Sequence, residues 1–275
     1  LGAVASLLML AALDQTIVTT ALPSIVTDLG NINQLSWIVT AYLLTATVSA
    51  PIYGKLGDIL GRKIMMQVAV IIFVFASILA ASAQTMNWIL IARAIQGLGG
   101  GGLFVLAFTV VADVVPSRSR GKIQGLFAAI FGSSSIVGPI AGGFIVETIS
   151  WHWIFLVNLP IGLCALIILN YSFNVKPIRK KKFSLDYLGA ALLSVSLGSL
   201  IILTTIASKS LLSNYVLVWL LGVVCIISLI LFVFAEYQAK DAILPLHLFK
   251  INNFLVYAFV ALISSSILFS ILTFL

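Results

Sequence analysis

The segment GKLGDILGRK, at residues 54–63, separates two long apolar runs at residues 37–53 and 64–83. It is rich in glycine, and it carries the acidic Asp58 among three basic residues. A membrane-spanning helix needs about 20 mostly apolar residues, and each flanking run approaches that length. The sequence therefore predicts two membrane spans joined by a short, charged loop.

The composition of the whole chain agrees with this interpretation. Hydrophobic residues make up 61% of the 275 residues and charged residues only 8%, whereas soluble domains carry roughly 25% charged residues. A water-soluble surface cannot be built from so few charges. The net charge of +7 comes from basic residues in the gaps between apolar runs, so we expect a lipid bilayer and not nucleic acid as the partner.

The sequence contains no recognisable metal, nucleotide or hydrolase motif. Cys164 and Cys225 each lie in an apolar run without a second Cys or a His at ligand spacing, so we expect buried thiols and no metal site. The chain lacks a GxxxxGK[ST] loop, a GxSxG elbow and an HExxH helix. We therefore expect no ATP-binding site, no cofactor and no enzymatic activity.

About nine apolar runs are long enough to be spans. They cover residues 1–25, 37–53, 64–83, 88–112, 123–146, 153–173, 187–207, 215–235 and 254–275. The first run lacks a preceding basic region and a following cleavage site, which indicates a span and not a signal peptide. Because the chain starts and stops within apolar runs, we expect it to be part of a longer protein.

The basic residues predict the orientation of these spans. Thirteen of the fifteen Lys and Arg lie in alternate gaps, the opposite gaps contain only Lys209, and Arg93 lies inside a span. The thirteen are Lys55, Arg62, Lys63, Arg118, Arg120, Lys122, Lys176, Arg179, Lys180, Lys181, Lys182, Lys240 and Lys250. Cytoplasmic loops carry this excess, so the pattern predicts a multi-pass membrane protein with a cytoplasmic N-terminus. We expect its membrane to be the plasma membrane, in a bacterium. The run at residues 176–186 is interpreted as an anchor on anionic lipid.

Two charged residues lie inside the apolar runs, Asp14 in LDQTIVTTALP and Arg93 in ARAIQGLGGGG. Charge within a membrane is costly, so both should face partners and not lipid. At a rise of ~1.5 Å per residue, the depths of the two residues in the membrane differ by roughly 8 Å. The long side chain of Arg93 can largely bridge this difference. A buried carboxyl can carry a proton. The alternative is a pair that only holds two helices together.

Small residues recur every four positions in the run at residues 123–146. Ser134, Gly138 and Gly142 form this small-residue stripe, and Pro139 lies within it. Such spacing favours close helix approach, and the Gly-Pro step permits a kink. A weaker stripe of Ala41, Thr45 and Ser49 is interpreted as packing.

Together these motifs resemble the major facilitator superfamily, and specifically its fourteen-span drug:proton antiporters. Residues 54–63 resemble the GxLaDrxGrk signature, although Ile59 stands where Arg is usual. Residues 13–23 resemble the LDxTIVNVALP signature, and WIVTAYL and WHWIFLVNLPIG at residues 37–43 and 151–162 are two further matches. Arg93, Gln96 and Gly97 resemble the RxxQGxG motif. The antiporter motif is matched by Gly125, Gly138, Pro139, Gly142 and Gly143.

The resemblance implies an all-α membrane protein with the major facilitator fold. Residues 1–175 would form the six-helix N-terminal bundle. Residues 176–252 would hold a basic loop, two additional helices and a following loop, and residues 253–275 the first helix of a C-terminal bundle. Substrate and protons would share a cavity between the two bundles, which expose it to each side in turn.

The resemblance also implies roles for individual residues. Asp14 and Arg93 would couple transport to protons. Thr16, Thr20, Tyr42, Gln96 and Gly97 would line the cavity. Gly54, Asp58, Gly61, Arg62 and Lys63 would form a cytoplasmic gating loop.

The leading hypothesis is export of small amphipathic or cationic molecules, such as drugs, in exchange for protons, with the proton gradient as the energy source. One alternative is export of a defined metabolite, siderophore or antibiotic by the same fold. Another is a membrane sensor or scaffold that does not transport. Membrane-buried charge at Asp14 and Arg93 argues against the last, because a scaffold does not need it.

Overall fold

A computed structural model describes residues 2–172, 186–207, 215–239, 243–244 and 246–274 of the chain, and every regular element in these residues is helical. The elements are α1 (Gly2–Leu29), η1 (Ile32–Gln34), α2 (Leu35–Leu60), α3 (Arg62–Ala81), α4 (Met86–Val114), α5 (Ser117–Thr148), α6 (His152–Leu156), α7 (Asn158–Ser172), α8 (Tyr187–Ala207), α9 (Tyr215–Gln238), η2 (Leu246–Lys250) and α10 (Asn252–Phe274). The expected all-α fold is confirmed.

Eight of the described helices are long and apolar enough to cross a membrane, when α6 and α7 are taken together as one span. These eight coincide with the first eight predicted runs. The ninth run is also helical, as α10, but its described apolar stretch, Asn252–Ser264, is shorter than a span. Nearly every residue of that stretch is exposed, so α10 packs little against the rest of the described chain.

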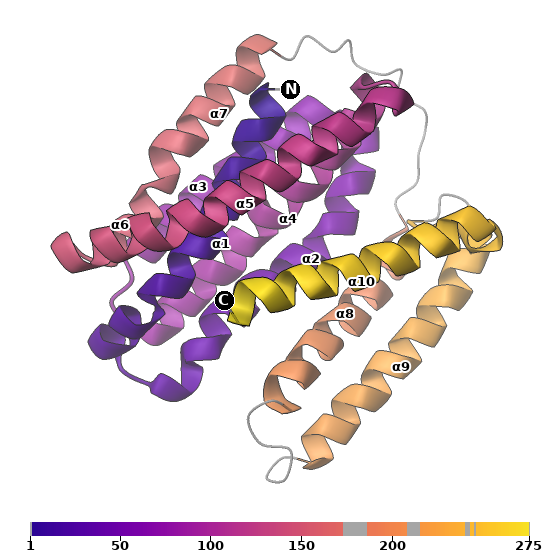
Figure 1. Cartoon of the computed structure of the whole chain (residues 1–275). Helices are drawn as coiled ribbons and strands as arrows, with labels where there is room; N and C mark the ends of the chain where they lie inside the picture. Colours follow the sequence, from indigo (N-terminus) through magenta and orange to yellow (C-terminus); the bar gives the residue numbers. More distant parts are fainter. Residues whose placement is uncertain (1, 173–185, 208–214, 240–242, 245, 275) are drawn as a thin grey trace.

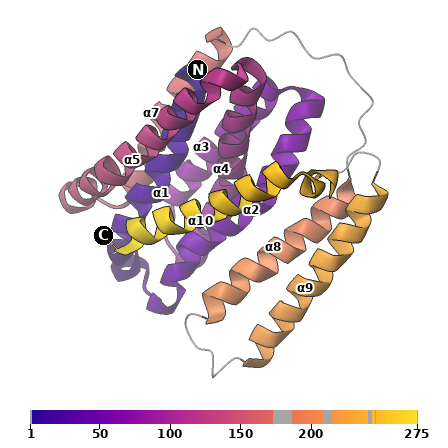
Figure 2. The ribbon, with the colours of Figure 1, turned by 45° about the vertical axis from the view of Figure 1, so that its right-hand side comes forward.

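The first seven α-helices form one bundle around α4, which packs against both α2 and α3 (Figure 1). On the other side, α1 packs against α5 and α7. Helices α8 and α9 lie side by side and join the bundle through the contact of α8 with α2, an arrangement visible in both orientations (Figure 2).

Glycines of α4 allow this dense packing. A Cβ atom at Gly99 would lie 2.6 Å from the carbonyl oxygen of Ala69 in α3. On the side facing α2, a Cβ at Gly97 would collide with Thr45, and one at Gly101 with Ser49. The interpretation of Thr45 and Ser49 as packing residues is therefore confirmed.

The junction of α2 and α3 differs from the predicted loop. Helix α2 continues to Leu60 and α3 starts at Arg62, so only Gly61 of residues 54–63 lies outside a helix. Its φ of 98° is a conformation that favours glycine. The prediction of a loop was wrong because the charged residues Lys55, Asp58, Arg62 and Lys63 lie on helix turns that extend beyond the apolar runs. A search for apolar windows does not detect these turns.

The small-residue stripe of α5 faces α1. Ser134, Gly138 and Gly142 are among the few buried residues of α5. A Cβ at Gly138 would collide with Thr16, and one at Gly142 with Thr20. The prediction of close packing along this stripe is confirmed, and α5 remains helical through Pro139.

We expect Gly138→Ala to destabilise the folded chain by about 1–3 kcal/mol, the usual cost of overpacking. Gly143→Ala is the matched control, because a Cβ there meets nothing within 4 Å and both variants gain the same helix propensity. Thermal unfolding in detergent compares the two. Equal unfolding temperatures would contradict the tight contact between α1 and α5.

Candidate functional site

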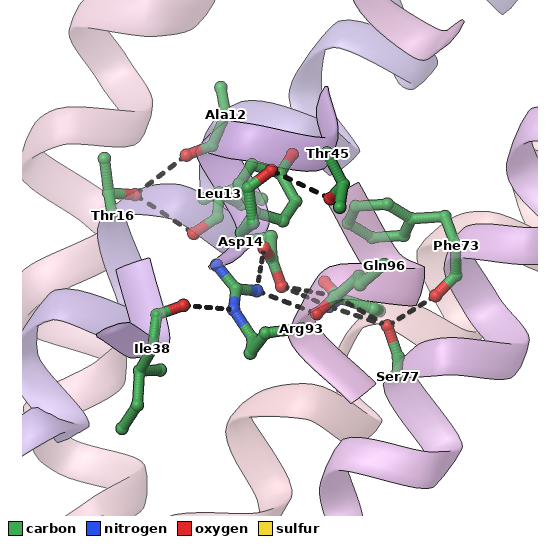
Figure 3. A network of polar contacts seen from close by, with 12 residues as sticks. Ala12, Leu13, Asp14, Thr16, Ile38, Thr45, Phe73, Ser77, Arg93 and Gln96 are labelled. Carbon is green, nitrogen blue, oxygen red and sulfur yellow. Dashed lines mark hydrogen bonds and ion pairs between the residues drawn. The ribbon is translucent and has the colours of Figure 1, made fainter. Parts of the chain in front are cut away.

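The two charged residues predicted inside the spans form an ion pair. Asp14 projects from α1 and Arg93 from α4, and Arg93 Nη1 lies 2.7 Å from Asp14 Oδ2. Each residue is 1% exposed. The pairing that the estimated depths allowed is therefore confirmed, and the bundle buries both charges. Figure 3 shows the Arg93 guanidinium directed toward the Asp14 carboxylate.

The Asp14 carboxylate also accepts two hydrogen bonds at its other oxygen. Gln96 Nε2 and Asn158 Nδ2 donate to Asp14 Oδ1 over 2.7 and 2.8 Å. Counting Arg93, three donors from two other helices surround the carboxylate. Charge-assisted bonds of this kind are stronger than those between neutral groups, so the three donors hold the carboxylate firmly in place.

Ser77 of α3 joins the two amides. Its hydroxyl accepts from Gln96 Nε2 at 2.9 Å and from Asn158 Nδ2 at 3.2 Å, and it donates to the carbonyl oxygen of Phe73 at 2.9 Å. Asp14, Ser77, Arg93, Gln96 and Asn158 together are called the Asp14 network below. All five are buried, and they tie α1, α3, α4 and α7 together.

Asn158 reaches the network because the helix is interrupted between α6 and α7. Pro160 lacks an N–H group and cannot bond to the carbonyl of Leu156, where α6 ends. Helix α7 restarts at Asn158.

Arg93 is held by further contacts. Its Nη1 donates to Gln96 Oε1 at 2.7 Å, and its guanidinium carbon lies 4.4 Å from the centre of the Tyr42 ring. A cation above an aromatic face is attracted by the ring, more strongly when water is excluded. These contacts fix the guanidinium beside Asp14.

The other residues predicted to line a cavity fall into two groups. Tyr42, Gln96 and Gly97 are buried, and they lie in or beside the Asp14 network. Thr16 and Thr20 lie instead along the contact between α1 and α5, where Thr16 Oγ1 donates to the carbonyl oxygen of Ser134 at 3.0 Å. The cavity-lining role of all five stays a prediction.

A second cluster lies at the α2–α3 junction. Arg62 lies 2.5 Å from Asp58 and 3.1 Å from Asp113 of α4, and it donates to the carbonyl oxygen of Gly54 at 3.1 Å. Lys63 donates to the carbonyl oxygen of Asn170 in α7. Asp58, Arg62 and Asp113 are called the junction cluster below. It forms although Ile59 replaces the usual Arg.

The antiporter motif is divided by the structure. Gly138 and Gly142 contact α1, whereas a Cβ at Gly125 or Gly143 would meet nothing within 4 Å in the described chain. Pro139 is exposed. The motif therefore contributes packing at two of its positions.

Sequence reasoning missed Ser77, Asn158 and Asp113. Asn158 lay within the recognised stretch at residues 151–162, and a polar residue in an apolar run was the signal that could have singled it out. Ser77 carried no such signal, because serine is common in membrane helices and normally bonds to its own helix.

The fold and the site together define a multi-pass membrane protein with a charged network enclosed in its helix bundle. Residues 4–275 match the Major Facilitator Superfamily, and the chain belongs to that family.

Two relatives from Bacillus subtilis (strain 168) are similar over most of the chain. Multidrug resistance protein 3 is 39% identical over 244 residues, which are 88% of this chain and 47% of that protein. Multidrug transporter protein MdtP is 37% identical over 263 residues, 96% of this chain and 48% of that protein. The chain thus spans about half the length of the curated relatives it matches. An Acurin A biosynthesis cluster MFS-type transporter of Aspergillus aculeatus is 36% identical over 206 residues, 73% of this chain and 37% of that protein.

Solved structures support the fold. The human organic anion transporter MFSD10 (TETRAN) superposes with a TM-score of 0.59 at 20% identity, covering 74% of this chain and 53% of that chain. A D-xylose-proton symporter superposes with a TM-score of 0.55 at 18% identity, covering 84% of this chain and 66% of that chain. At these identities the likeness concerns the fold alone.

We expect Arg93→Ala to destabilise the chain by about 3–5 kcal/mol, because it leaves the Asp14 charge buried without its partner. Arg62→Ala is the control, since its pairs in the junction cluster involve half-exposed carboxylates and exposed pairs contribute about 0.2–1 kcal/mol each. Thermal unfolding in detergent measures both losses. A larger loss for Arg62→Ala than for Arg93→Ala would contradict this ranking.

Proposed function

We propose that the chain is the N-terminal half of a proton-coupled exporter of small amphipathic or cationic molecules, driven by the proton gradient without a cofactor. The observation that carries the proposal is the Asp14 network, a carboxylate that is 1% exposed inside a membrane bundle and paired with a guanidinium. Buried ionisable groups of this kind mark ion and proton pathways. The names of the two Bacillus subtilis relatives favour drugs as substrates.

Exchange of substrate for protons follows if both compete for the Asp14 carboxylate. When Asp14 is ionised, its charge balances that of Arg93, and the pair is stable in a low dielectric. A proton on Asp14 removes that balance and leaves the guanidinium with uncharged partners, which are Gln96 Oε1, the carbonyl oxygen of Ile38 and the Tyr42 ring. A cationic substrate near Asp14 favours the ionised form and so expels the proton. The two therefore bind in alternation.

Because both groups are enclosed here, alternation requires the bundle to open. We propose that opening occurs against a second bundle and that residues 1–175, 176–252 and 253–275 form the N-terminal bundle, the additional helix pair with its loops, and the start of that second bundle. Thr16, Thr20, Tyr42, Gln96 and Gly97 would line the cavity between the bundles. Gly54, Asp58, Gly61, Arg62 and Lys63 would gate its cytoplasmic side.

Export of a defined natural product is the second candidate function. It is favoured by the similarity to the Acurin A biosynthesis cluster transporter, and it uses the same proton coupling. The two candidates differ only in substrate.

We expect Asp14→Asn to abolish substrate efflux driven by a pH gradient in the full-length protein, because the amide keeps the shape of the side chain but cannot ionise. Efflux from proteoliposomes under an imposed gradient, at matched protein amounts, measures the effect. Asp28→Asn is the control, since Asp28 lies on the same helix but is exposed and accepts from Trp151 Nε1, as an Asn oxygen also can. Gradient-driven efflux by Asp14→Asn at the wild-type rate would refute coupling at Asp14.

We propose further that the protein lies in the plasma membrane with its N-terminus in the cytoplasm. The junction of α2 and α3 contacts the end of α4 through Asp113 and the end of α7 through Asn170. The basic residues of these segments therefore gather at one end of the bundle, as the positive-inside rule expects of the cytoplasmic side. Residues 176–182, Lys209 and Lys240 lie outside the described residues.

Cysteine labelling in intact cells tests this orientation. After replacement of Cys164 and Cys225 by Ser, we expect Gln84→Cys, in the exposed turn between α3 and α4, to react with a membrane-impermeant maleimide. Ser119→Cys, exposed at the start of α5, should react only after the cells are opened. The reverse pattern would invert the topology.

A further inference from the structure

Asn158 holds a buried acceptor without a donor among the described residues. Its Nδ2 donates to Asp14 and to Ser77, whereas its Oδ1 has no hydrogen-bond partner in the part of the chain that the structure describes, although the residue is 1% exposed. Buried polar atoms are normally bonded, because an unmade bond costs free energy. An unsatisfied atom beside the central carboxylate therefore needs an explanation.

The protonation of Asp14 supplies one. An ionised carboxylate only accepts hydrogen bonds, but a protonated one also carries an O–H group that needs an acceptor. Asp14 Oδ1 is the oxygen that would take the proton, because its donors are the neutral amides of Gln96 and Asn158, whereas Oδ2 accepts from the charged Arg93. Within reach of Oδ1, Gln96 uses its own oxygen to accept from Arg93. The remaining free carbonyl oxygen in the network is that of Asn158.

We propose that Asn158 is a positioning residue for the proton on Asp14, donating to the ionised carboxylate and accepting from the protonated one. The change requires half a rotation of the amide about its terminal torsion, for which side chains of this type have broad, two-fold minima. The rotation brings Oδ1 to the former place of Nδ2, beside Asp14 Oδ1 and Ser77 Oγ.

The exchange adds one proton to the network and rearranges its bonds. Asn158 Nδ2 gives up its bonds to Asp14 and Ser77, and Asn158 Oδ1 accepts in its place. One proton arrives on Asp14 Oδ1, and the new O–H donates to Asn158 Oδ1. The Ser77 hydroxyl, which donates to Phe73 in the ionised state, is able to turn and donate to the same oxygen. Asn158 itself neither gains nor loses a proton.

Few other ionisable groups face this exchange. Arg93 of α4 pairs with Asp14, and the phenol of Tyr42 in α2 lies against the guanidinium. From α3 and α7 come Ser77 and Asn158, which do not titrate in this range. None of the described residues of α5 and α6 joins the network by a hydrogen bond, and their Glu147 and His152 lie near the helix ends.

The inference rests on the proposed proton coupling at Asp14, and it predicts a shift in pH dependence. Asn158→Leu removes both the donor and the acceptor. Because the bond to the ionised carboxylate is roughly twice as strong as a neutral one, we expect the midpoint of the pH profile of efflux to move up by about one pH unit. Asn158→Asp should move it further, since two adjacent carboxyls share one proton.

The test compares these variants in the full-length protein, by efflux from proteoliposomes across a pH series. Leu169→Ala is the matched control: Leu169 is buried on the same helix but lies outside the network, so this variant should lose stability without a shift of the midpoint. Should the Asn158 variants fail to transport, infrared titration of the protonated carboxyl band that Asp14→Asn removes gives the same midpoint directly.

The outcomes separate this inference from the proposed function. Shifted midpoints for the Asn158 variants with an unshifted Leu169→Ala support it. Wild-type midpoints in both Asn158 variants, with efflux lost in Asp14→Asn, overturn the role of Asn158 and leave the coupling site intact. Unchanged efflux in Asp14→Asn overturns the coupling site and with it this inference.

Discussion

The ion pair of Asp14 and Arg93 constrains the whole bundle. Removing two charges from water costs free energy. The cost is offset only when the charges are close and their remaining hydrogen-bond donors and acceptors are paired. In a membrane no water is available to repair a poor geometry. Helices α1 and α4 must therefore stay in fixed register, and α3 and α7 must present Ser77 and Asn158 at the same depth.

The packing around α4 meets this demand. Glycine at positions 97, 99 and 101 removes the side chains that would hold α2 and α3 away. Between membrane helices hydrophobicity offers no drive to associate, so close approach and polar bonds have to supply it. The glycines provide the first and the Asp14 network the second, and both depend on the same few turns of α4.

The sequence predicted the features that depend on one residue type or one spacing. Asp14 and Arg93 stood out as charges in apolar runs, and the spacing of Ser134, Gly138 and Gly142 predicted the buried face of α5. Partner choice was harder, because it depends on how each helix is rotated. The rotation of α1 about its axis directs Asp14 toward Asn158, 144 residues away in the sequence. The same rotation directs Thr16, two positions further on, toward α5. The extent of α2 was also missed, because hydropathy does not detect charged helix ends.

The satisfied and unsatisfied atoms of the network show which hydrogen bonds a proton on Asp14 would change. Three donors converge on the Asp14 carboxylate, while the oxygen of Asn158 lacks a donor within the described ranges of the chain. A protonated Asp14 would reverse this balance, turning one accepted bond into a donated one. A proton on Asp14 must therefore either rearrange the amides or loosen the helices that carry them. Coupling between protonation and helix packing follows, because the groups that respond to the proton also join four helices.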